Sequence, residues 1–114
     1  MSGGFFEYDQ YRIGRMADSI EQELKNQGKK KPKDDLWGTE DYYEKYPEDR
    51  FYPTYTALVQ EKLREAVNAL RQAEIYAHRV DWFLSGDDGE DNFPERLSSD
   101  LEEFMKSKKY LKTK

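Results

Sequence analysis

One segment of the chain carries an unbroken heptad pattern of apolar residues, and this pattern constrains the fold more than any other feature. Eight residues follow one another at alternating spacings of four and three: Val59, Leu63, Ala66, Leu70, Ala73, Ala77, Val80 and Leu84. That spacing places them on one narrow stripe of an α-helix. The pattern predicts a long central helix over about residues 56–84, whose apolar stripe must be shielded by neighbours.

Two further segments have helical spacing. Apolar residues recur through residues 10–27, where Asp9 is placed to cap the helix and Gly28 to end it. A final helix is predicted to begin near Pro94, and the short turn before it implies an antiparallel hairpin with the central helix. The sequence therefore predicts a single all-α domain over residues 1–114, a small helical bundle around one long central helix.

The remaining segments are an N-terminal arm (1–9), an aromatic-rich connector (28–53) and a basic tail (106–114). Within the connector, Thr39 is placed to cap a short helix. The final helix is about half as long as the central one, so the first helix and the connector, or a second copy of the chain, must cover the Val59 end. The uninterrupted heptads favour a homo-oligomer, and an intramolecular bundle that uses the same seam is the alternative.

Composition excludes several classes of function. The chain has 114 residues, a formal net charge of −5 and no cysteine. A negative charge argues against direct nucleic-acid binding, and the lack of cysteine excludes disulfides and thiolate metal sites. No apolar run is long enough to span a bilayer, so a cytoplasmic protein without membrane contact is expected. We expect no cofactor.

Metal and catalytic motifs are also missing. The acidic turn that starts at Asp87 has Asn92 where a calcium loop needs glycine, and Ser98 where it needs glutamate. The single histidine, His78, has Glu74 four residues earlier, a spacing that favours a structural contact over a catalytic triad. The sequence therefore predicts no metal site and no enzyme.

The N-terminal region is the best candidate for a ligand site. It combines rings for stacking, an amide for the edge of a base and guanidiniums for phosphate, which are the groups that bind nucleotides. The candidate ligand-binding residues are Phe6, Tyr8, Gln10, Tyr11, Arg12, Arg15, Trp37 and Arg79. The same residue types also occur at the start of an amphipathic helix, where they only pack or face solvent.

Three sequence stretches resemble a family of small proteins from tailed bacteriophages and prophages. They are Ser2-Gly3-Gly4-x-Phe6-x-Tyr8-x-Gln10-Tyr11-Arg12-Ile13, Ile75-Tyr76-Ala77-His78-Arg79-Val80-Asp81-Trp82 and Ser85-Gly86-Asp87-Asp88-Gly89-Glu90. The resemblance implies the cytoplasm of an infected bacterium and transfers no catalytic residue. By analogy, small non-enzymatic phage proteins often interfere with host machinery.

Two hypotheses of function follow. The first is a non-enzymatic inhibitor of host defence that sequesters a nucleotide-derived signal in a pocket lined by aromatic and arginine side chains, at a subunit interface. The second is an acidic module that docks on a host protein, as a nucleic-acid mimic, through the carboxylates of residues 34–49 and 87–103.

Overall fold

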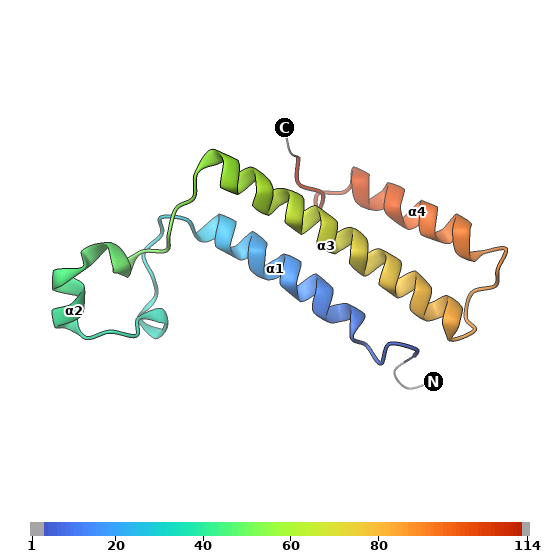
Figure 1. The fold of residues 1–114 in the computed structure, drawn as a ribbon, viewed down its shortest axis with the longest axis horizontal. Coiled ribbons are helices and arrows are strands. Elements are labelled where there is room, and N and C mark those ends of the chain that lie inside the picture. The colour runs from blue at the N-terminus through green and yellow to red at the C-terminus, as the bar shows by residue number, and fades with distance from the viewer. Residues whose placement is uncertain (1–3, 113–114) are drawn as a thin grey trace.

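The computed structural model describes residues 4–112 and shows an all-α fold. Its body consists of three long helices (Figure 1): α1 (Gln10–Asn26), α3 (Ala57–Leu84) and α4 (Phe93–Lys106). Between α1 and α3 lie a short helix, α2 (Glu40–Lys45), and two 3₁₀ turns, Lys33–Asp35 and Pro47–Arg50. The predicted all-α fold around a long central helix is confirmed. No helix among the described residues is long and apolar enough to cross a membrane.

Helix α3 begins and ends where its sequence supplies the required groups. The Thr56 hydroxyl accepts a hydrogen bond from the Val59 amide at 3.2 Å, as an N-cap does. At the other end Gly86 has a φ of 88°, a left-handed conformation that glycine adopts without steric cost. The 28 residues of α3 span about 42 Å at 1.5 Å per residue.

The start of α1 differs from the prediction. Asp9 occupies the predicted N-cap position directly before Gln10, but it has helical backbone angles and its side chain makes no capping hydrogen bond. An N-cap side chain reaches the amides of the first turn from an extended backbone, whereas Asp9 is helical and its carboxylate lies 3.6 Å from the Arg12 guanidinium. At the other end, the predicted left-handed Gly28 is confirmed, with a φ of 72°.

The three long helices lie side by side in one layer, with α3 in the middle (Figure 1). Helices α1 and α4 both run antiparallel to α3, and the molecule measures 63 × 36 × 17 Å. The predicted hairpin of α3 and α4 is therefore confirmed. Asn68 of α3 also fixes the segment after α4, because its side chain donates to the Leu111 carbonyl at 2.6 Å and accepts from the Leu111 amide at 2.8 Å.

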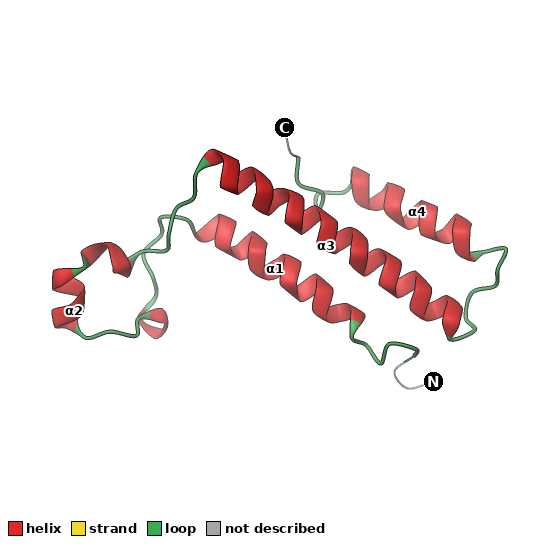
Figure 2. Ribbon diagram, viewed as in Figure 1, coloured by secondary structure: helices red, strands yellow, loops and turns green. Residues whose placement is uncertain are grey.

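Residues 32–49 form a lobe beyond one end of the helical layer (Figure 2). A backbone ladder makes its neck: the Lys31 amide donates to the Arg50 carbonyl at 2.7 Å, and the Tyr52 amide donates to the Lys29 carbonyl at 2.8 Å. Inside the lobe the Tyr43 ring is buried. The aromatic connector thus packs largely on itself and leaves the start of α3 uncovered.

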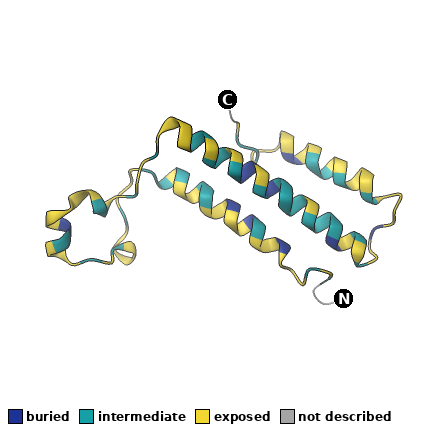
Figure 3. Ribbon diagram, viewed as in Figure 1, coloured by how far each residue is buried: buried dark blue, intermediate teal, exposed yellow. Residues whose placement is uncertain are grey.

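The hydrophobic core is small. Only four apolar residues in the described part of the chain are buried: Ala17, Tyr43, Val67 and Phe104. None of the eight heptad residues is buried: Val59 and Leu84 are exposed and the other six are half-buried. Most of the ribbon of the three long helices is half-buried or exposed (Figure 3). Within one chain, the expected shielding of the heptad stripe is therefore incomplete.

Candidate ligand-binding cavity

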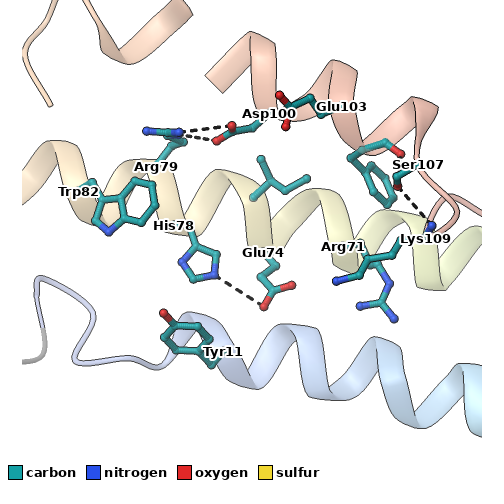
Figure 4. A pocket seen from close by; sticks show the side chains of 12 residues that line it. Tyr11, Arg71, Glu74, His78, Arg79, Trp82, Asp100, Glu103, Ser107 and Lys109 are labelled. Atoms are coloured by element: carbon teal, nitrogen blue, oxygen red, sulfur yellow. Dashed lines mark hydrogen bonds and ion pairs between the residues drawn. The ribbon is translucent and has the colours of Figure 1, made fainter. Parts of the chain in front are cut away.

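A cavity of about 580 Å³ opens between α1, α3 and α4 (Figure 4). Pockets for small organic ligands typically measure roughly 300–1,000 Å³, so its size fits such a ligand. All three helices and the segment after α4 contribute side chains. The lining residues are Tyr11, Arg71, Glu74, Ile75, His78, Arg79, Trp82, Asp100, Glu103, Phe104, Ser107 and Lys109.

One wall of this cavity is aromatic. The Tyr11 ring of α1 meets the His78 ring of α3 edge to face, with centroids 4.8 Å apart. Trp82 lies one helical turn further along α3, and its centroid is 6.0 Å from that of His78. Tyr11 and Trp82 remain exposed, so both rings keep surface on which a planar ligand can stack.

The two cavity arginines are already paired with carboxylates. Arg79 binds Asp100 of α4 and lies 3.3 Å from Asp88, and its guanidinium stacks 4.7 Å from the centroid of Trp82. Its hydrogen bond to Asp100 is the main reason that the pKa of Arg79 is raised. These contacts tie α3 to α4 and hold the Trp82 ring in place.

Arg71 connects α3 to α1 in the same way. It is buried and forms ion pairs with Glu21 at 2.7 Å and Asp18 at 2.8 Å. Burial alone lowers the pKa of Arg71, but the hydrogen bonds to Glu21 and Asp18 outweigh it and the pKa is raised. Because both guanidiniums are neutralised, the main cavity is close to balanced in charge.

Two smaller cavities adjoin the main one, and all three share Tyr11. The second, of about 280 Å³, contains Arg15 and Lys109. Asp18 and Glu74 also line this cavity, but among the described residues no carboxylate lies within ion-pair distance of Arg15 or Lys109, so these two cations can meet an anion.

The third cavity, of about 230 Å³, is lined by hydrogen-bond acceptors. Asp81, only 4% exposed, accepts a hydrogen bond from the Phe6 amide at 2.8 Å. Gln10 is 5% exposed, and its Oε1 has no hydrogen-bond partner in the described part of the chain. A buried acceptor without a partner costs free energy, and a donor that enters the adjacent cavity, either water or a ligand, would satisfy it.

Five of the predicted ligand-binding residues line these cavities: Tyr8, Gln10, Tyr11, Arg15 and Arg79. The other three lie elsewhere. The Phe6 ring packs against Phe5, Arg12 is exposed and pairs with Asp9 at 3.6 Å, and Trp37, 72% exposed, stacks on Tyr42 in the lobe. The N-terminal and C-terminal sequence motifs therefore meet at one site, although residues 1–3 lie outside the described residues.

Sequence reasoning missed Glu74, His78, Trp82 and Lys109 as parts of the site. Three of them recur every four residues on α3, which places them on one helical face, and this spacing was the usable signal. The predicted contact within that series is present, since His78 Nε2 lies 3.7 Å from the Glu74 carboxylate. Lys109 comes from the segment after α4, and only the Asn68–Leu111 hydrogen bonds of the folded chain bring that segment near the site.

Metal ligands do not gather in this site: no group of three or more histidine, cysteine, aspartate or glutamate side chains within residues 4–112 is arranged to hold a metal ion.

In comparisons with known proteins, no protein-family model, curated protein or solved structure matches this chain.

Proposed function

We propose that this chain is a non-enzymatic binding protein that captures a nucleotide-derived signal in the three adjoining cavities. The resemblance of its sequence to phage proteins supplies the setting, an inhibitor of host defence that acts by sequestration in the cytoplasm of an infected bacterium. All three cavities are lined by residues of one chain, so this proposal does not need a second copy to complete the site.

The observation that carries the proposal is the unpartnered Gln10 acceptor beside exposed aromatic rings. A nucleobase offers both a planar face for stacking and amino or ring N–H groups that donate to an amide oxygen. Tyr11 and Trp82 border both this cavity and the main one, so a base that binds at Gln10 contacts the rings of both.

The opposite end of the site supports the phosphate half of such a ligand. Arg15 and Lys109 are the cations there without carboxylate partners among the described residues. Guanidinium and ammonium groups bind phosphate through charge-assisted hydrogen bonds. An acceptor end, a ring wall and a cationic end thus follow one another in the order that a nucleotide requires.

The alternative, an acidic module that mimics nucleic acid, has less support. Several of its carboxylates have partners inside the chain: Asp88 binds Arg79 and Arg96, Asp100 binds Arg79, and Glu40 binds Arg50 at 3.0 Å. Charges neutralised in this way contribute little to attraction of a basic partner. Retention of a host protein by the chain that weakens steeply at high salt would favour this alternative.

The direct test uses the two tryptophans. Trp37→Phe leaves Trp82 as the sole tryptophan, at the wall of the main cavity. Titration with cyclic di- and trinucleotides and ADP-ribose derivatives should change its fluorescence in a saturable way, and calorimetry on the unaltered protein should give the same affinity. Folded protein that gives no heat with any of these compounds would contradict the proposal.

Gln10→Leu separates binding from folding. The change removes an acceptor that has no partner, so the free energy of unfolding should stay equal or rise. Affinity for the nucleotide should fall about tenfold, as expected for the loss of one hydrogen bond of roughly 1.4 kcal/mol. Gln22→Leu, an exposed change on the same helix, is the matched control and should leave affinity unchanged. Equal affinities of the two variants would refute the role of Gln10.

A further inference from the structure

Helix α3 is contacted by its two neighbours on two separate faces. Toward α1 it presents Arg71, which pairs with Glu21, and His78, which packs on Tyr11. Toward α4 it presents Arg79, which pairs with Asp100, and Phe83, whose ring lies 4.9 Å from that of Phe93. With 100° of rotation per residue, these two sets leave a third arc of α3 on which none of these contact residues lies.

The heptad stripe occupies this third arc. Its central members, Leu70, Ala73 and Ala77, are half-buried and not fully buried. Helix α1 adds to the same face, because Met16 and Ile20 lie on the side of α1 opposite the cavity residues Tyr11 and Asp18. Met16 is 54% exposed. One side of the helical layer is therefore an apolar surface about 40 Å long, and the cavities open on the other side.

The chain exposes more surface than a compact monomer of its mass. A compact monomer of 13.6 kDa is expected to expose roughly 6,600 Å², whereas the chain exposes 8395 Å². Its radius of gyration is 19.2 Å, against roughly 13 Å for a compact domain of this length. The projecting lobe accounts for part of the excess. The whole excess, about 1,800 Å², exceeds the roughly 800 Å² that each partner buries in a standard interface.

We infer that a second copy of this chain packs on the heptad face, stripe against stripe. All eight stripe residues are apolar, and heptad spacing is the pattern with which one α-helix packs along another. Ala66, Ala73 and Ala77 carry small side chains, so the two α3 helices can approach closely. A twofold axis through the stripe makes the surface its own complement, as an isologous dimer requires.

This arrangement determines where the ligand sites lie in the dimer. Because the cavities open on the opposite side of the layer, a dimer carries two complete sites that face outward. The inference therefore does not depend on the proposed function: loss of the dimer and loss of nucleotide binding are separate outcomes.

Light scattering coupled to size exclusion tests the dimer. The unaltered chain should have at least twice the mass of one 13.6 kDa chain. The double variant Ala73→Arg/Ala77→Arg should fall to the mass of one chain while circular dichroism shows that its helices persist. Leu58→Arg, on an exposed position of α3 outside the stripe, is the matched control and should keep the larger mass. A single-chain mass for the unaltered protein at every concentration would overturn the inference.

A second experiment tests whether the heptad stripe forms the contact between the two chains. The chain has no cysteine, so Ala73→Cys introduces a single thiol near the midpoint of the stripe. An antiparallel dimer brings this position close to its own copy, and mild oxidation should link the two chains. Ser98→Cys, exposed on α4, should link far more slowly. Equal rates of linkage would place the contact on another surface and reject the proposed face.

Discussion

At the scale of single residues, Gly14 shows how one missing side chain shapes the site. A Cβ built on Gly14 would lie 2.3 Å from a Glu74 carboxylate oxygen, so the absence of a side chain in α1 is what lets Glu74 reach across from α3. Glu74 in turn lies 3.7 Å from His78. A glycine that costs helix stability thus provides the space in which the cavity side chains are arranged.

We predict that Gly14→Ala raises the stability of the chain and lowers its affinity for the nucleotide. Alanine should stabilise α1 by up to about 1 kcal/mol, because only the flexible end of Glu74 has to move. The displaced carboxylate narrows the cavities, so nucleotide affinity should fall. Urea unfolding and calorimetry measure the two effects. In a Glu74→Ala background the same change should give its full stabilisation, and a loss of stability there would refute this explanation.

A second prediction at this scale concerns Tyr42 in the lobe. Its hydroxyl donates to the Asp49 carboxylate, and this hydrogen bond, with smaller effects of burial and charge, raises the pKa of Tyr42 from 10.0 to about 12. A pKa raised by folding means that the contribution to stability is complete below about pH 10 and is lost as the pH rises toward 12.

Alkaline titration followed by tyrosine absorbance should therefore show a late ionisation near pH 12. Asp49→Asn should move it toward lower pH, because the main cause of the shift is removed. Tyr42→Phe should remove the ionisation near pH 12, whereas Tyr46→Phe should lower it less than Asp49→Asn does, because the charge of Tyr46 is the smallest of the causes that raise the pKa of Tyr42. A titration of Asp49→Asn identical to that of the unaltered protein would show that this hydrogen bond does not form.

At the scale of elements, charged residues take part of the role that apolar residues usually have between helices. Val67 and Ala17 are the fully buried apolar side chains of α3 and α1. Beside them Arg71, also buried, joins the two helices through Asp18 and Glu21. The packing of α1 on α3 is therefore sensitive to the loss of one charge.

We predict that Arg71→Ala lowers the free energy of unfolding by about 2 kcal/mol. A buried pair that loses one partner typically costs more, but Asp18 is largely exposed and water compensates part of the loss. Arg12→Ala is the matched control: its pair with Asp9 is exposed on both sides, and its loss should cost less than about 0.5 kcal/mol. Chemical unfolding measures both, and similar costs for the two variants would contradict this account.

At the scale of the whole molecule, the elements were predictable and their packing was not. The heptad stripe predicts α3, Thr39 predicts the cap of α2, and Gly28 predicts the end of α1, because each depends on residues close together in the chain. Periodicity does not say which face of α3 meets a neighbour. Here polar positions such as Arg71 and Arg79 form ion pairs with α1 and α4, and the apolar stripe is covered only in part.

The candidate site was predictable where its residues are close in sequence. Tyr8, Gln10, Tyr11 and Arg15 share one short segment and line the cavities. Lys109 joins them only through the return of the chain after α4, and sequence spacing contains no sign of that contact. Trp37, an aromatic residue of the kind that often lines a site, belongs to a lobe whose position depends on the neck ladder.

The neck between Lys31 and Arg50 yields a prediction about the whole chain. Replacement of residues 32–49 by a two-residue Asn-Gly turn should keep the ladder, because such a turn joins antiparallel segments. The melting temperature of the helices and the nucleotide affinity should then change little. Loss of helical signal after the replacement would show that the lobe supports the body.

If the replacement succeeds, it defines how this chain can vary. The backbone leaves the helical layer and returns to it at adjacent points. The length and sequence of the lobe between these points then do not affect the packing of the helices. Such a junction can accept a longer, shorter or entirely foreign segment. Related chains would then differ most between α1 and α3, and a reporter peptide grafted there would leave both ends of the protein untouched.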